Sequence, residues 1–201
     1  MFSQFQGAKA KPQRQQKGQS IQYELTIPFV TAVMGGESQI RVQKASGKNE
    51  SITVKIPAGI EDGKKIRLRG QGEPPPGSQG KAGDILITVR VTPHKFFTRR
   101  GKNLNVKVPV TLTEAVEGGK IDVPTPQGTV SLSVPPKTSS GAKLRIKGHG
   151  VAPAQGEPGD LYAELLIVLP ENPDAECAEL IKQLSRKFET QSGNPRKDLK
   201  W

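Results

Sequence analysis

The stretch "IPAGIEDGKKIRLRGQG" (Ile56–Gly72) decides the fold, because a near-copy, "VPPKTSSGAKLRIKGHG" (Val134–Gly150), returns 78 residues later. The N-terminal parts of the two halves also match, since "FVTAVMGG" (29–36) lies against "LTEAVEGG" (112–119). A spacing kept at so many positions indicates one structural unit that occurs twice. The two copies share a proline, an arginine and several glycines, at the pairs Pro57/Pro135, Gly63/Gly141, Arg67/Arg145, Gly70/Gly148 and Gly72/Gly150.

Apolar residues alternate with polar ones through most of both halves. In "IQYELTIPF" (21–29) every second residue is apolar, which is the period of a half-buried strand. The same pattern predicts further strands over 38–44, 51–57, 63–70, 83–91, 104–112, 119–126, 128–136, 141–148 and 159–170. The chain is therefore predicted to be mainly β, with two tandem β-sandwich-like domains at 21–95 and 96–170. The polar, basic residues 1–20 are predicted to be a disordered linker.

The C-terminal segment 171–201 differs from the repeats. Apolar residues at helical spacing predict a helix around Glu176–Phe188, with Asn172 and Pro173 as its N-cap and first turn and Gly193 as its end. A lone helix of this length is marginal in water, so its apolar stripe must be covered by the second domain or by a partner chain. The stripe consists of Leu180, Ile181, Leu184 and Phe188.

Composition bounds the environment and the partners. The chain has 30 basic and 19 acidic residues, a formal net charge of +11, which favours nucleic acid, an acidic membrane or an acidic peptide as partner. Solubility alone explains such a charge equally well. The single cysteine, Cys177, excludes an internal disulfide and a cysteine-based zinc cluster, and it suits a reducing cytoplasm. No secretory signal or membrane-spanning apolar run is found.

The residues show no catalytic constellation. The two histidines, His94 and His149, lie in opposite halves, no nucleophile motif occurs, and no His, Asp or Glu cluster has metal-ligand spacing. The repeated glycines lack a following helix that would make them a phosphate-binding loop, so tight turns and strand corners explain them. Neither an enzyme nor a cofactor is expected. Nucleic acid remains an alternative partner on the net charge alone. The sequence lacks the interleaved aromatic and basic residues of a single-strand-binding protein.

Several motifs in order resemble the C-terminal peptide-binding region of DnaJ-type co-chaperones, over about residues 20–190. They are "IPAGIEDGKKIRLRGQGEP", "GDILITVRVTPHKFFTRRGKNL", "EAVEGGKIDVPTPQG" and "GDLYAELLIVLP", and the most specific piece is the pattern H-x-x-F-x-R-x-G at 94–101. The His-Pro-Asp triplet of a J-domain and the cysteine-rich zinc module do not occur. The chain therefore resembles a fragment of the class B form, and we do not expect it to stimulate a DnaK-type ATPase itself.

The resemblance implies a polypeptide-binding function in protein folding and the stress response. It implies that unfolded segments lie in a shallow apolar groove on the first domain and are delivered to a DnaK-type chaperone. The matching positions for the groove are Ile27, Phe29, Ile40, Val42 and Phe97. For Ile27 and Ile40 a core position is an equal alternative, whereas Phe29 and Phe97 favour the groove because they neighbour turns.

The resemblance also implies three partners. The acidic C-terminal tail of the DnaK-type chaperone is expected on basic residues of one strand pair in the first domain, although a solvated basic face is the open alternative. The helical stripe is expected to form a homodimer, shaped as a horseshoe. DNA is the second candidate ligand, through similarity to the curved-DNA-binding branch of class B. The basic residues are Lys55, Lys64, Lys65, Arg67 and Arg69.

Overall fold

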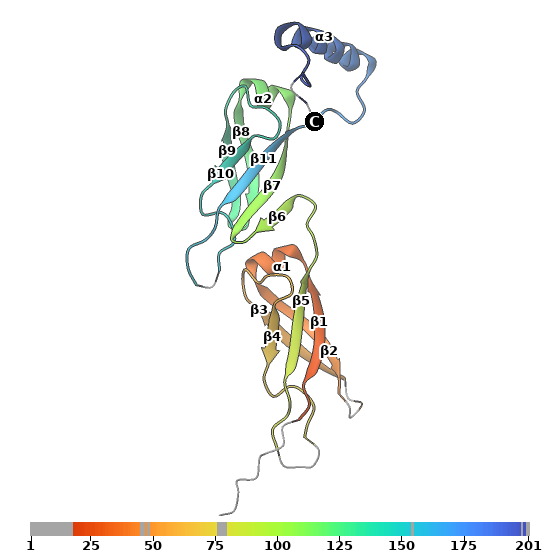
Figure 1. Ribbon diagram of the computed structural model, residues 1–201, viewed down its shortest axis with the longest axis vertical. Coiled ribbons are helices and arrows are strands. Elements are labelled where there is room, and N and C mark those ends of the chain that lie inside the picture. Colours follow the sequence, from red (N-terminus) through yellow and green to blue (C-terminus); the bar gives the residue numbers. More distant parts are fainter. Residues whose placement is uncertain are drawn as a thin grey trace, which may run out of the picture.

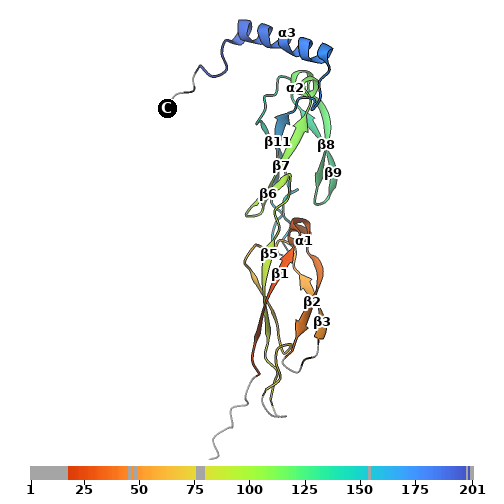
Figure 2. The ribbon, with the colours of Figure 1, turned by 90° about the vertical axis from the view of Figure 1, so that its right-hand side faces the viewer.

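The computed structural model describes residues 18–44, 47, 49–75, 80–153, 155–197 and 199. Most of the predicted linker at 1–20 lies outside these residues. Two β-rich domains stack end to end into an elongated molecule, and a C-terminal helix lies beyond the second domain (Figures 1 and 2). The prediction of a mainly β chain with two tandem domains is confirmed.

The first domain consists of two sheets and a short connecting helix. A three-stranded sheet has the order β1-β5-β4, with β1 parallel to β5 and β4 antiparallel to it, and an antiparallel pair, β2 and β3, forms the second sheet. The inward residues of both sheets form one core, which includes Leu25, Val54 and Ile87. The elements are β1 (Ile21–Ile27), α1 (Phe29–Met34), β2 (Gly36–Gln43), β3 (Asn49–Ile56), β4 (Lys65–Leu68) and β5 (Ile85–Val91).

The second domain repeats this plan and adds one strand. Its larger sheet has the order β10-β11-β7-β6, in which β6 has no equivalent in the first domain's sheet, and β8 pairs with β9. Val33 of α1 belongs to the core of this domain, so the two domains share a packed boundary. The elements are β6 (Phe97–Arg100), β7 (Asn103–Val110), α2 (Leu112–Glu117), β8 (Gly119–Thr125), β9 (Gly128–Val134), β10 (Lys143–Ile146) and β11 (Leu161–Ile167).

The repeated arginine and glycine form the same backbone corner in each domain. In the first domain the Nε of Arg67 donates to Oδ2 of the buried Asp84 at 2.7 Å, and the N–H of Gly70 donates to its Oδ1 at 3.0 Å. Gly72 is required nearby because a Cβ there would lie 2.7 Å from the carbonyl carbon of Gly83. The motif that reveals the repeat is therefore a structural corner, where a backbone turn closes around one carboxylate.

The second domain has the same corner around Asp160. The Nε of Arg145 donates to its Oδ2 at 2.8 Å, and the N–H of Gly148 donates to its Oδ1 at 2.9 Å. The Gly148 N–H, and then Arg145, hold the pKa of Asp160 below its ordinary value. This stabilisation is present above the ordinary aspartate pKa, at about 4, and is lost as the pH falls through the lower folded pKa.

We therefore predict a pH-dependent effect of Asp160→Asn. At pH 6–7 the variant should unfold at a lower temperature than the wild type, because the amide cannot form the ion pair. The difference should shrink as the pH falls below about 4 toward the lowered folded pKa, where the wild-type carboxylate becomes protonated. Thermal unfolding across this range measures it, with the exposed Asp122→Asn as control. A difference that stays constant with pH would show that the charge of Asp160 is irrelevant.

The two short helices differ from the predicted strands. The strand predicted over 21–29 ends at Ile27, because Pro28 begins the turn into α1. In the second domain Thr111 and Glu114 form a capping box, in which the Glu114 carboxylate accepts the Thr111 N–H at 2.8 Å. This arrangement holds the pKa of Glu114 below its ordinary value. Both helices end at the first glycine of a Gly-Gly pair, Gly35 and Gly118, and each of these glycines has a positive φ.

The C-terminal helix α3 (Ala175–Ser192) contains the predicted span Glu176–Phe188 and extends beyond it on both sides. Its N-cap is Asp174, whose side chain accepts the N–H of Cys177 at 2.7 Å, so the prediction of Asn172 as the cap is wrong. The helix starts directly after Asp174, whose carboxylate accepts the N–H of the third helical residue, as an N-cap side chain does. The predicted end at Gly193 is confirmed.

Candidate functional site

An arginine from β6 clamps the two domains together. Arg99 donates from Nη1 to the carbonyl of Ile60 at 2.7 Å and from Nη2 to the carbonyl of Gly59 at 2.8 Å, both in the first domain. Its Nε donates to the carbonyl of Gly101 at 2.7 Å, and its side chain is only 17% exposed. A Cβ on Gly59 would lie 2.9 Å from Cγ1 of Val151, so the domains meet closely at this loop.

A histidine organises the aromatic residues beside this clamp. Nδ1 of His94 accepts the backbone N–H groups of Phe96 and Phe97, each at 3.2 Å, so the imidazole fixes the turn into β6. Its ring centroid lies 5.1 Å from that of Phe97 and 5.8 Å from that of Phe29 of the first domain. The H-x-x-F-x-R-x-G pattern therefore builds the joint between the domains.

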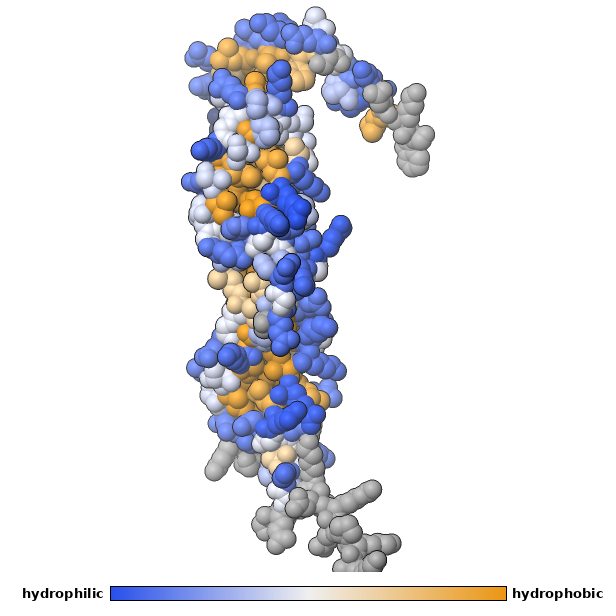
Figure 3. Space-filling view, turned by 90° about the vertical axis from the view of Figure 1, so that its left-hand side faces the viewer, coloured by the Kyte–Doolittle hydropathy of each residue, from blue (hydrophilic) through white to orange (hydrophobic). Residues whose placement is uncertain are grey.

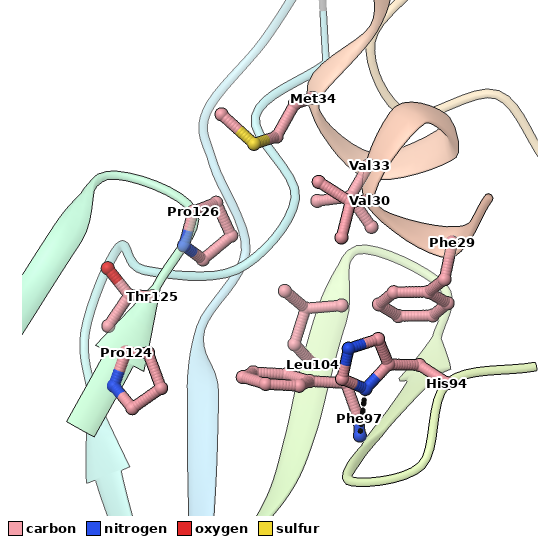
Figure 4. Close-up of a pocket in the computed structure, with 10 residues that line it drawn as sticks. All are labelled: Phe29, Val30, Val33, Met34, His94, Phe97, Leu104, Pro124, Thr125 and Pro126. Carbon is pink, nitrogen blue, oxygen red and sulfur yellow. Dashed lines mark hydrogen bonds between the residues drawn. The ribbon is translucent and has the colours of Figure 1, made fainter.

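The joint encloses an apolar cavity of about 180 Å³, which we call the junction pocket (Figure 4). The α1 side chains form one wall, and residues 124–126 at the end of β8 lie opposite them. The lining residues are Phe29, Val30, Val33, Met34, His94, Phe97, Leu104, Pro124, Thr125 and Pro126.

The junction pocket combines a rigid floor with an open rim. Val33 and Leu104 are 4% and 1% exposed and belong to the core of the second domain, whereas Val30 and Met34 are 51% and 56% exposed. An apolar cavity of about 150 Å³ is large enough to hold a benzene ring. The junction pocket can therefore take one leucine-sized or aromatic side chain, with Met34 as an adaptable edge.

The structure separates the five predicted client-binding residues. Phe29 and Phe97 come together in the junction pocket. Ile27, Ile40 and Val42 are 1%, 1% and 3% exposed in the first-domain core, so the prediction that they line an open groove is corrected. The physical reason is the strand alternation itself, which turns these three side chains between the two sheets.

Sequence reasoning missed the contributions of α1 and of residues 124–126. The segment "FVTAVM" places Phe29 with Val33, and Val30 with Met34, four residues apart, which is the spacing of one helix face. The strand predicted over 21–29 includes Phe29 and ends there, so the prediction does not place Phe29 on a helix face. No local pattern indicates that Pro124 and Pro126 would lie opposite, because the domain packing brings them there.

The predicted basic residues are exposed but do not form one strand pair. Lys55 lies on β3 and Lys65 on β4, and these strands belong to different sheets, so that prediction is wrong. Lys64 lies 3.8 Å from Glu61, and Arg69 is exposed beyond the end of β4. Arg67 is bound to Asp84 at the structural corner, which leaves Lys55, Lys64, Lys65 and Arg69 as the candidates for an acidic partner.

The predicted dimerisation residues share one helix and remain largely uncovered. On α3, Leu180, Leu184 and Phe188 are 59%, 46% and 65% exposed, and Ile181 is half-buried. Apolar side chains are visible along α3 and over each domain in the space-filling view (Figure 3). Within the described residues, the second domain thus does not bury the stripe.

Two further features limit the chemistry of the described residues. They contain no group of three or more His, Cys, Asp or Glu side chains able to hold a metal ion. No helix among them combines the length and apolar character that crossing a membrane requires.

Comparison with known proteins decides the family. The model of the DnaJ C terminal domain matches residues 21–170, which covers both β domains. The chain belongs to the DnaJ C-terminal domain family. Within the family, relatives named "Curved DNA-binding protein" are similar to this chain. The one from Pseudomonas putida (strain W619) is 41% identical over 91% of this chain and 60% of its own length.

Two other relatives with the same name extend the similarity across bacteria. The protein of Serratia proteamaculans (strain 568) is 37% identical over 98% of this chain, and that of Coxiella burnetii (strain Dugway 5J108-111) is 35% identical over 96%. The chain spans 60% to 66% of the length of these relatives. The family membership thus rests on the two β domains and their junction.

Proposed function

We propose that this chain is a polypeptide-binding module, with domains at 21–95 and 96–170, that holds apolar segments of unfolded proteins. The observation that carries the proposal is the junction pocket, where Phe29 and Phe97 line an apolar cavity whose rim is open to solvent. Burying one large apolar side chain contributes on the order of 1.5–3 kcal/mol, which suits reversible binding of many sequences. The DnaJ family membership supports the same function.

The bound polypeptide is then delivered to a DnaK-type chaperone. Lys55, Lys64 and Lys65 are exposed on the first domain and attract the acidic tail of such a partner. None of these lysines lines the junction pocket, which stays accessible to the client.

DNA binding is the second candidate function. It is favoured by the net charge of +11 and by the name of the relatives, "Curved DNA-binding protein". Binding to DNA by lysines and arginines weakens steeply with salt, because it is driven by the release of counterions.

A pair of titrations separates the two functions. We expect an apolar peptide to bind at near-physiological salt with an affinity that changes little when salt is raised. We expect DNA, followed by gel shift, to bind measurably only at low salt. Tight DNA binding at physiological salt without any peptide binding would reverse the assignment.

We further propose a homodimer through α3. Burying its exposed stripe of Leu180, Leu184 and Phe188 is favourable, and a self-complementary patch closes a two-fold dimer. Two junction pockets on one particle raise the effective affinity for long chains. We expect such a chaperone to act in the cytoplasm.

Deleting residues 171–201 is predicted to yield a monomer. Light scattering at micromolar concentrations should give twice the chain mass for the intact protein and a single chain mass for the truncated one. The truncated protein should bind short peptides unchanged but protect long clients poorly. A monomer mass for the intact chain would contradict the dimer.

A further inference from the structure

The two polar side chains that line the junction pocket differ in how their hydrogen-bonding groups are used. Apart from Thr125 and His94, the lining residues have apolar side chains. The Thr125 hydroxyl donates to the carbonyl of Gly128 at 2.6 Å and accepts the N–H of Gln127 at 3.2 Å. It also lies 3.1 Å from Nδ1 of His149. The hydroxyl is therefore satisfied outside the pocket, and His94 is left as the polar group that a ligand meets.

The turn into β6 fixes the tautomer of His94. Nδ1 accepts the backbone N–H groups of Phe96 and Phe97, each at 3.2 Å. A ring nitrogen that accepts these hydrogen bonds carries no proton, so the neutral imidazole carries its proton on the other nitrogen. Nε2 of the neutral His94 ring is therefore a hydrogen-bond donor.

This donor faces the pocket. Figure 4 shows the ring nitrogen that is not bonded to Phe97 turned toward Leu104 and the space between the two walls. Within the described residues, Nε2 has no hydrogen-bond partner, because both hydrogen bonds of His94 are made by Nδ1. No buried side-chain nitrogen or oxygen in this part of the chain lacks a partner, so Nε2 is accessible to solvent in the free protein.

A ligand that fills the pocket shields Nε2 from solvent and must supply an acceptor in return. A buried donor without an acceptor is costly, and a site arranged to bond a hydroxyl rejects the analogue that lacks it. A carboxylate would accept the bond, but burying its charge between apolar walls is unfavourable. An aromatic ring with an uncharged hydroxyl satisfies the donor and suits an apolar cavity of about 180 Å³.

We propose that the junction pocket selects tyrosine over phenylalanine in unfolded polypeptides, because Nε2 of His94 donates to the tyrosine hydroxyl. This inference rests on the proposed function, since it specifies the client side chain that enters the pocket. The imidazole is held in place by its Nδ1 bonds and by the rings of Phe29 and Phe97, whose centroids lie 5.8 and 5.1 Å away. The donor is therefore oriented before the client binds.

An asparagine separates the two functions of His94. Asparagine side chains accept nearby backbone N–H groups in turns, so His94→Asn keeps an acceptor for the turn and removes the donor at Nε2. The probes are two short fluorescent apolar peptides, identical except for a central tyrosine or phenylalanine, measured by anisotropy. The quantity compared is the ratio of the two affinities, because loss of the imidazole ring weakens both peptides.

We expect the wild type to bind the tyrosine peptide about tenfold more tightly than the phenylalanine peptide, and His94→Asn to bring this ratio below about twofold. His149→Asn is the matched control and should keep the wild-type ratio, since His149 does not line the pocket. A wild-type ratio near one, or an unchanged ratio in His94→Asn, would overturn the tyrosine selection. Thermal unfolding checks that both variants are folded.

The same peptides distinguish this failure from failure of the proposed function. If both bind the wild type equally and both weaken in Val30→Ser with Met34→Ser, the tyrosine selection is wrong and the pocket still binds polypeptide. If neither peptide binds the wild type, both proposals are wrong.

Nitrogen NMR of the histidine side chains tests the donor without a variant in the binding reaction. The chain contains two histidines, and the spectrum of His94→Asn assigns them. At slightly alkaline pH we expect the His94 proton on Nε2, and we expect the tyrosine peptide to shift this proton downfield more than the phenylalanine peptide does. A histidine that only fixes the turn would show no tyrosine-specific shift. A proton on Nδ1, or equal shifts with both peptides, would overturn the proposal.

Discussion

Replacing Val30 and Met34 together with serine is expected to weaken binding of an apolar peptide by about 30-fold while leaving thermal unfolding nearly unchanged. Both side chains line the junction pocket and are about half exposed in the free protein. Each therefore loses on the order of 1 kcal/mol of burial with the ligand, and about 2 kcal/mol corresponds to roughly 30-fold. Exposed substitutions of this kind change the free energy of unfolding by no more than about 0.5 kcal/mol.

The repeat supplies a matched control for this experiment. Val116 on α2 occupies the place that Val33 has on α1, is 62% exposed and lies outside the junction pocket. Val116→Ser should leave peptide affinity unchanged. Unchanged affinity in the folded Val30 and Met34 double variant would remove the junction pocket from the binding surface.

Replacing Arg99 with methionine is expected to lower the free energy of unfolding by about 3 kcal/mol. The guanidinium donates to two carbonyls of the first domain and is largely buried, and hydrogen bonds from a charged group contribute about 1.5–3 kcal/mol each. Methionine keeps the length of the apolar stem but leaves the carbonyls of Gly59 and Ile60 without their donor. Denaturant unfolding measures the loss.

The Arg99 variant should also loosen the domain junction. Spin labels on the exposed Thr53 of the first domain and Lys120 of the second report the distance between domains. We expect a narrow distribution in the wild type and a broad one in Arg99→Met. Arg100→Met, on the exposed face of the same strand, is the matched control and should resemble the wild type. An unbroadened distribution in Arg99→Met would show that other contacts fix the domains.

Much of the architecture could be predicted because the determining signals are local. The alternation in "IQYELTI" places Leu25 and Ile27 inward, and the matched glycines and arginines reveal the repeat before any packing is known. The corner around Asp84 explains why Arg67 and Gly70 recur in the second half. The Arg67 side chain and the Gly70 backbone N–H both donate to the same Asp84 carboxylate. The fold class depends on such short-range patterns.

The candidate site was less predictable because it depends on contacts between domains. Alternation distinguishes the two faces of a strand but not an interior face from a groove, so the prediction places Ile40 and Val42 on a surface that they do not reach. The carbonyl partners of Arg99 lie 39 and 40 positions away in the sequence, and no spacing rule connects them. Only the packed junction brings Phe29 and Phe97 together.

The most direct test of the junction pocket uses its methionine. The chain contains two methionines, of which Met34 lines the pocket and Met1 lies at the N-terminus. In protein labelled with ¹³C at the methionine methyl groups, an apolar peptide should shift the Met34 resonance in proportion to the bound fraction and leave that of Met1 unmoved. A peptide that binds by anisotropy without moving the Met34 resonance would contradict binding at the domain junction.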